Sequence, residues 1–284
     1  MQFDFPGALG VPDGRYLARD GSGEEGQRVL VIETLGAPSP PRRKRRAKQI
    51  EPGDGPEPLP LTRVTAVRAQ EPFDSTEDAQ RWLEETFANE DSTEAAIADA
   101  LGLLNRALHA QTVASADSRG TELSVQNAVV ARIGHGSGKE VAAGRFTEAN
   151  ALDPRTASGS RRQRRDEELR PQERLAAILG GRERVDTCET LLLRARSDLN
   201  AGRYREAALQ LRVALEALLI ELDGALADPG HEEDMAELGA RRKEAGDAAN
   251  AALRGELDVE QESQIVELIE LCERVLRRRR ILRG

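Results

Sequence analysis

Through the first 150 residues, short runs of apolar and β-branched residues alternate with turn-forming residues. This pattern predicts strands over 15–19, 28–35 and 61–68, and a later hairpin with arms at 128–133 and 139–146. Glycine-rich residues fill the turn between the two arms of that hairpin. We therefore expect a small antiparallel β-sheet in this part of the chain.

Two amphipathic helices are predicted between the third strand and the hairpin. Asp74 or Ser75 can cap the first helix, and Ser92 opens the second. Together with the sheet, these helices indicate an α+β domain over residues 1–150. The apolar residues at helical spacing are Ala79, Trp82, Leu83 and Phe87 in the first helix, and Ile97, Leu101, Leu104 and Leu108 in the second.

Two segments rich in proline or arginine interrupt the pattern. Residues 37–60 contain seven prolines. Because proline removes a backbone donor and fixes φ, we expect an extended linker or loop there. Residues 151–165 contain Asp153-Pro154, a Ser-Gly-Ser sequence and several arginines. This composition predicts a basic linker between two domains.

The second domain, residues 166–284, has helical periodicity throughout. A short helix is expected to end at Gly180-Gly181. Longer helices are predicted over 185–199, 204–222 and 232–254, and from 258 onward. Four long helices joined by short turns predict an antiparallel up-down bundle.

Composition limits the class of protein. The 284 residues carry 41 basic and 50 acidic side chains, and 39% of them are hydrophobic, which is enough to bury a core. No apolar run approaches the roughly 20 residues that a membrane span needs. The first residues also lack the basic and apolar regions of a secretory signal. We therefore expect no membrane span.

Cysteine and histidine positions argue against several chemistries. Cys188 and Cys272 fall on apolar helical stripes, so we expect buried thiols in a cytoplasmic protein. None of the three histidines lies near a cysteine or another histidine at metal-ligand spacing. We predict no metal, no cofactor and no catalytic residue. Whether the chain is an enzyme stays open, and a non-enzyme is favoured.

One helix pair resembles two known helical families. Gly202-x-Tyr204-x-Glu206-Ala207-Ala208 is similar to the second helix of a tetratricopeptide repeat. The stretch 195–219, with Leu199, Gly202, Ala207 and Glu216, resembles the helical hairpin of HEPN-type domains. Many of those domains are ribonucleases that use an arginine followed closely by a histidine. No arginine stands shortly before His231, so the resemblance implies a helical hairpin without that activity.

Two further stretches carry a resemblance of the whole chain to proteins of unknown function from GC-rich actinobacteria. They are VVARIGHG at 129–136 and LQLRVALE at 209–216. This resemblance implies no particular activity.

Three clusters of basic residues stand out on an otherwise acidic chain. Such clusters attract phosphate backbones, which makes nucleic-acid or other anion binding one alternative. In the other interpretation, arginine keeps linkers solvated and complements the end of a helix. The chain also has few aromatic residues on which bases could stack. The clusters are Arg42, Arg43, Lys44, Arg45, Arg46 and Lys48; Arg161, Arg162, Arg164 and Arg165; and Arg277, Arg278, Arg279, Arg280 and Arg283.

The turn from Gly134 to Lys139 is a second candidate anion site, because backbone N–H groups in glycine-rich turns cradle phosphates. A phosphate-binding loop would need glycine in place of Ile133 and Ser or Thr in place of Glu140. The turn therefore favours a structural hairpin, and phosphate or nucleotide binding remains an alternative.

The main functional hypothesis rests on an apolar stripe, either on the helix at 232–254, which has few large side chains, or on the wide stripe of the helix at 204–222. This stripe is expected to meet a protein partner or a second copy of the chain. We interpret the chain as a non-catalytic interaction or scaffold protein that uses a bundle face and its arginine-rich segments. The residues of this predicted partner face are Tyr204, Leu211, Leu215, Leu218 and Leu222.

Overall fold

The computed structural model describes residues 1–18, 28–36, 59–69, 72–117, 120, 122–154, 173–255 and 257–283. Two of the basic clusters, 42–48 and 161–165, lie outside these residues, as does most of the proline-rich segment. The chain divides into two compact units, Met1–Ser160 (unit 1) and Arg161–Gly284 (unit 2). None of the described helices is both long enough and apolar enough to cross a membrane.

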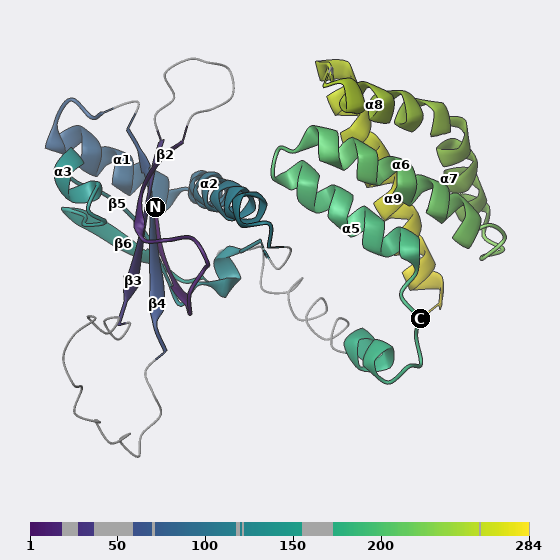
Figure 1. Ribbon diagram of the computed structural model, residues 1–284, viewed down its shortest axis with the longest axis horizontal. Helices are drawn as coiled ribbons and strands as arrows, with labels where there is room; N and C mark the ends of the chain where they lie inside the picture. Colours follow the sequence, from purple (N-terminus) through teal and green to yellow (C-terminus); the bar gives the residue numbers. More distant parts are fainter. Residues whose placement is uncertain are drawn as a thin grey trace. The chain divides into compact units, whose positions relative to one another are not determined.

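Unit 1 is built around a six-stranded antiparallel sheet (Figure 1). β3 and β4 pair along their whole length, with Leu35 opposite Leu61. The proline-rich segment therefore connects two neighbouring strands of one sheet. In the spatial order β2-β3-β4-β1-β5-β6, the strands are β1 (Gln2–Pro6), β2 (Gly14–Ala18), β3 (Arg28–Leu35), β4 (Leu61–Arg68), β5 (Val130–His135) and β6 (Glu148–Leu152).

β1 has a central place in the sheet that the sequence pattern does not reveal. It pairs with β4 on one side and β5 on the other, and both of its faces are buried. Phe3 and Phe5 enter the apolar core, whereas Gln2 and Asp4 point to the opposite face. Arg63 donates two hydrogen bonds to Asp4, at 2.8 and 2.9 Å. Because this pairing buries polar residues, hydrophobicity alone does not identify the strand.

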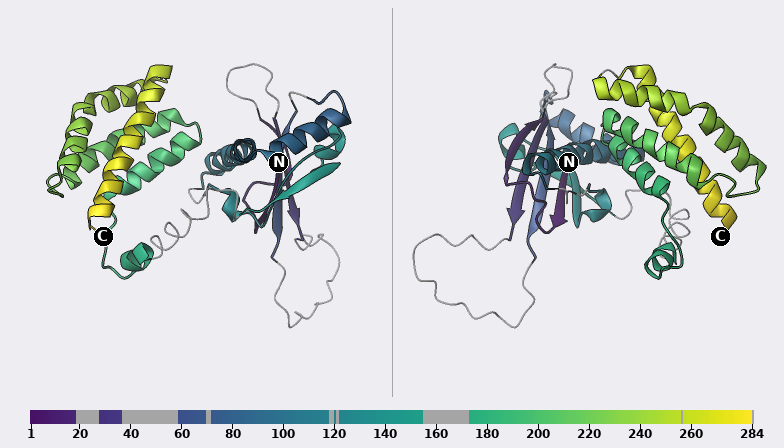
Figure 2. Two further views of the ribbon diagram at one scale, coloured as in Figure 1. Left: turned by 180° about the vertical axis from the view of Figure 1, so that it is seen from behind. Right: turned by 45° about the vertical axis from the view of Figure 1, so that its right-hand side comes forward.

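Helices α1 (Thr76–Ala88) and α2 (Glu90–Ser115) cover one face of the sheet (Figures 1 and 2). Ser75 caps α1, as predicted, since its hydroxyl accepts a hydrogen bond from the Asp78 N–H. α2 begins earlier than expected, because Asn89 rather than Ser92 supplies its cap. Asp99 of α2 pairs with both Arg28 and Arg68, which ties this helix to β3 and β4.

The predicted hairpin is present, but its second arm lies further along the chain. β5 pairs with β6, with His135 opposite Glu148. Residues 139–146, predicted as the second arm, contain most of α3 (Gly138–Val141) and a turn at Gly144, whose φ is 72°. The Gly144 carbonyl accepts a hydrogen bond from the Gln2 side chain. This contact holds the segment against the polar side of the sheet, so that β6 starts only at Glu148.

Unit 2 is helical in its described part and has two layers (Figures 1 and 2). α5, α6 and α8 lie side by side, and α9 crosses behind them with α7 packed against it. A short helix at 173–179 precedes α5. The longer helices are α5 (Thr187–Asn200), α6 (Tyr204–Glu221), α7 (Pro229–Ala240), α8 (Arg242–Arg254) and α9 (Val259–Arg283).

Local contacts explain how α5 and α6 form an antiparallel hairpin. Gly202 turns the chain between them with a φ of 71°, a conformation that favours glycine. At the other end of the hairpin, Glu221 of α6 accepts hydrogen bonds from the backbone N–H groups of Thr187 and Cys188. The last turn of α6 thereby caps the start of α5.

The helix predicted at 232–254 is in fact two helices, α7 and α8, that meet at Arg241. Arg241 has a ψ of 2° and ends the first helix while opening the second. Gly239 lowers the helix propensity next to this bend. The bend lets α8 lie along α6 while α7 packs against α9, so a four-helix up-down bundle is not formed. The chain as a whole is α+β, with an antiparallel sheet and two helices followed by a helical region.

Candidate docking surface

The predicted partner face of α6 lies inside unit 2. Leu211, Leu215, Leu218 and Leu222 are at most 1% exposed, and Tyr204 is half-buried against the same core. They pack with residues of α5 and α9. The stripe is wide because α6 has α5, α8 and α9 as neighbours, so the sequence interpretation of these leucines as a partner face is wrong.

The arginines at the end of α9 are largely engaged within unit 2. Arg278 pairs with Asp228 and Asp234, at 3.4 and 3.2 Å. Arg279 pairs with Asp186, and Arg280 pairs with Glu189. Arg277 is exposed and lines a small hollow, and Arg283 belongs to the last turn of α9. These pairs neutralise three of the five arginines of this cluster.

Glycines in the turn at 134–139 serve close packing. A Cβ atom at position 134 would lie 2.4 Å from the Glu148 carbonyl oxygen, and one at position 136 would lie 2.9 Å from the Thr147 nitrogen. Lys139 is exposed on α3, a helix of one turn. Close packing alone explains why glycine stands at positions 134 and 136, so anion binding is not needed to explain these glycines. This supports the interpretation of the turn as a structural hairpin.

Large apolar side chains also occur on the side of α6 that faces away from the core. At 100° per residue, positions 209, 213 and 220 fall within about 40° of one another, opposite the buried leucines. Val213 is 54% exposed and Ile220 is 76% exposed, while Leu209 is half-buried. Leu209 packs against the core of unit 2, so the large apolar residues that α6 exposes on this side are Val213 and Ile220.

Neighbouring helices add further exposed apolar residues to these two. Leu193 of α5 is 65% exposed. Leu253 of α8 is 66% exposed and lies at helical spacing from Asn250, which bonds to Arg212 of α6. We call the exposed set Leu193, Val213, Ile220 and Leu253 the outer face.

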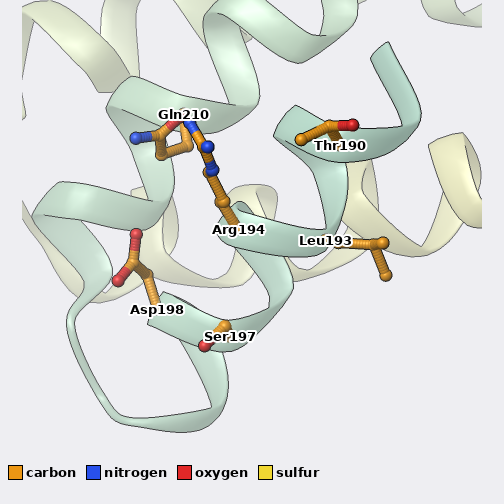
Figure 3. A pocket seen from close by; sticks show the side chains of 6 residues that line it. All are labelled: Thr190, Leu193, Arg194, Ser197, Asp198 and Gln210. Atoms are coloured by element: carbon orange, nitrogen blue, oxygen red, sulfur yellow. The ribbon is translucent and has the colours of Figure 1, made fainter. Parts of the chain in front are cut away.

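Two hollows flank Leu193. The larger, of about 490 Å³, is open to solvent and lies between α5 and α6 (Figure 3). Figure 3 shows the Arg194 side chain extending toward Gln210, with Leu193 on the other side of α5. The second hollow, of about 220 Å³, lies between α5 and α9 and includes Glu189 and Arg277. A ridge with hollows on both sides is a shape that a partner helix can pack against.

The surface of α9 differs from the outer face. Between residues 260 and 280 the exposed side chains of α9 are all charged or polar, while Val259, Ile281 and Leu282 are exposed at its two ends. The outer face thus combines several large apolar residues, whereas the middle of α9 has charged and polar ones. These side chains are Glu260, Ser263, Glu267, Glu270, Arg274, Arg277 and Arg280.

The two cysteines are poorly suited to chemistry. Both are free and buried. Burial raises the pKa of Cys188 to about 12, and the neighbouring Glu221 carboxylate adds to the effect. Burial likewise raises the pKa of Cys272 to about 12. A thiol with such a pKa is protonated at neutral pH and is a weak nucleophile and metal ligand.

No protein-family model, curated protein or solved structure matches the chain. The outer face therefore has to be judged by its own geometry. A sequence signal for it exists, since Val213 and Ile220 lie seven residues apart, at helical spacing. That signal is weaker than the leucine stripe on the other side of the same helix, which is why the sequence alone points to the wrong side.

Proposed function

We propose that the chain is a non-catalytic protein-interaction module that binds its partner through the outer face of unit 2. The observation that carries this proposal is the exposure of Val213 and Ile220 on the side of α6 opposite the core. Exposed apolar residues grouped on one surface are typical of interaction sites. The middle of α9, residues 260–280, supports the choice, because its exposed side chains are all charged or polar.

Burial of two free thiols supports a reducing compartment, and the proposal includes a cytoplasmic location. The partner is a different protein or a second copy of the chain.

Site-specific cross-linking tests the proposal. A photoreactive residue is placed at position 213 of the full chain, and a matched one at position 270 on α9. The proposal expects a cross-linked species from position 213, identified by mass spectrometry, that is lost on Leu193→Asp and absent from position 270. Sedimentation of the purified chain shows whether this species is a second copy. Equal cross-linking from both positions, or none from position 213, would contradict the proposal.

A further inference from the structure

We infer that α7 is a displaceable cover of unit 2. It detaches from α9 while the other helices of the unit stay folded, and its departure uncovers two arginines of α9. α7 lies at the edge of unit 2, packed against α9 (Figures 1 and 2). The device is independent of the outer face.

The buried side of α7 is more polar than that of α5, α6, α8 or α9. Of the three residues that α7 buries, His231 and Asp234 are polar, and Leu238 alone is apolar. α6 by contrast buries six apolar residues and no polar one. Both ring nitrogens of His231 are buried without a hydrogen-bond partner among the described residues. Burial of an unpaired polar group costs free energy, and a detached α7 regains it by exposing the ring to water.

Ion pairs supply much of the contact between α7 and α9. Asp234 lies 3.2 Å from both Arg274 and Arg278. Glu237 lies 3.2 Å from Arg274, and Asp228, which caps α7, lies 3.4 Å from Arg278. Arg274 and Glu237 are both about half exposed. Exposed ion pairs are weak and are screened by salt, so Asp234 is the main polar anchor of the helix.

α7 masks the charge of α9 at this place. Among the described residues, the ion-pair partners of Arg274 and Arg278 all lie on α7 or at its cap. Detachment of α7 therefore leaves two unpaired arginines one helical turn apart on α9. They lie next to the place that Leu238 vacates in the apolar core. An acidic helix of the chain itself thus blocks a basic strip of α9.

The chain turns at both ends of α7. Gly224, in the turn before α7, has a φ of 63°. Arg241, at the bend after α7, has a ψ of 2°, and no side-chain hydrogen bond caps α8 there. Hinges are a few residues at the ends of elements that absorb changes in φ and ψ. These two turns let α7 move as one body.

Native-state hydrogen exchange of the full chain, followed by mass spectrometry, tests the inference. We expect the amides of α7 to exchange about tenfold faster than the central amides of α5, α6 and α9. Leu199 is buried at the turn from α5 to α6, at the other end of α6 from the turn that leads to α7. Leu199→Ala destabilises the attached and detached forms alike. It should therefore speed exchange in α5 and α6 about tenfold or more and leave α7 unchanged.

Substitutions on α7 test how the helix is held. Asp234→Asn keeps the shape of the side chain and removes the charge that pairs with both arginines, so it should speed exchange of the α7 amides about tenfold. Glu237→Gln is the matched control, because its ion pair is exposed. It should speed α7 by less than about threefold. Circular dichroism checks that each variant is folded.

Two results would overturn the inference. In the first, α7 of the wild-type chain exchanges no faster than the core of unit 2. In the second, Leu199→Ala speeds exchange in α7 and α6 equally, which means that α7 opens only when the whole unit unfolds. Equal effects of Asp234→Asn and Glu237→Gln would overturn the role of Asp234 as the anchor. The wild-type measurement decides the inference even if a variant fails to fold, and the cross-linking from position 213 decides the proposed function separately.

Discussion

Arg174, in the short helix before α5, donates two hydrogen bonds to the buried carboxylate of Glu189, at 2.7 and 2.6 Å. Arg280 of α9 pairs with the same carboxylate. Glu189 therefore joins three segments of unit 2 that are distant in sequence. The hydrogen bonds from Arg174 are the main reason that the pKa of Glu189 is lowered.

This arrangement predicts a pH-dependent contribution to stability. Because the folded pKa is below the unfolded value of about 4.3, the contribution is complete above that value and is lost as pH falls through the folded pKa. Glu189→Gln should lower the free energy of unfolding by about 2 kcal/mol at neutral pH. The difference from wild type should narrow in acid. Urea unfolding followed by circular dichroism at several pH values measures it.

Glu183→Gln is the matched control for that prediction. Glu183 also pairs with Arg174, at 2.8 Å, but its side chain is 41% exposed. Exposed ion pairs contribute about 0–1 kcal/mol, so this variant should stay close to wild type. If both substitutions lowered the free energy of unfolding equally, the burial of Glu189 would not make its ion pairs stronger than an exposed one.

The two apolar sides of α6 should respond differently to substitution. Leu215→Ala removes a core side chain and is expected to cost about 2–5 kcal/mol. Val213 lies two residues away in sequence but is exposed, so Val213→Ala should change the free energy of unfolding by less than about 0.5 kcal/mol. Thermal or urea unfolding of both variants measures this. Similar costs at the two positions would mean that the outer face is covered.

Gly134 in β5 and Gly138 at the start of α3 offer another matched pair of substitutions. Gly134→Ala should disrupt the pairing of β5 with β6, because its Cβ would meet the Glu148 backbone. Gly138→Ala should be tolerated, since no atom lies within 4 Å of its Cβ position. Hydrogen exchange of the amides in β6 follows the effect. Stabilisation of the wild-type chain by added phosphate or nucleotide would instead favour an anion-binding turn.

We expect the paired arginines at the end of α9 to stabilise unit 2. Arg278→Gln removes the ion pairs of Arg278 with Asp228 and Asp234, of which Asp234 keeps a pair with Arg274, and should lower the melting temperature. Arg277→Gln, at an exposed neighbour, should leave it unchanged. If both substitutions weakened salt-dependent binding of duplex DNA without changing the melting temperature, these arginines would be a nucleic-acid site after all.

Both thiols should be protected in the folded chain. With pKa values raised to about 12, Cys188 and Cys272 carry little thiolate at pH 8. A thiol-specific reagent should modify them slowly in the native chain and rapidly in urea. Fast native labelling of Cys188 would show that the start of α5 opens readily.

Local pattern was enough to predict several elements closely. β3 and β4 have the expected bounds, 28–35 and 61–68, because each is rich in β-branched and apolar residues. Ser75 caps α1 as predicted. β1 was missed because its two polar residues are buried by partners from β4 and from the segment before β6. The bend at Arg241 was missed because the apolar spacing continues across it.

The sequence by itself determined the α+β class, the helical second half and the leucine stripe of α6. Only the tertiary structure decided that this stripe is buried, because periodicity shows that residues share a face but not what packs against it. The same holds for charge. Arg280 pairs with Glu189 across 91 positions of sequence, so only the fold could show that Arg278, Arg279 and Arg280 are already paired within unit 2.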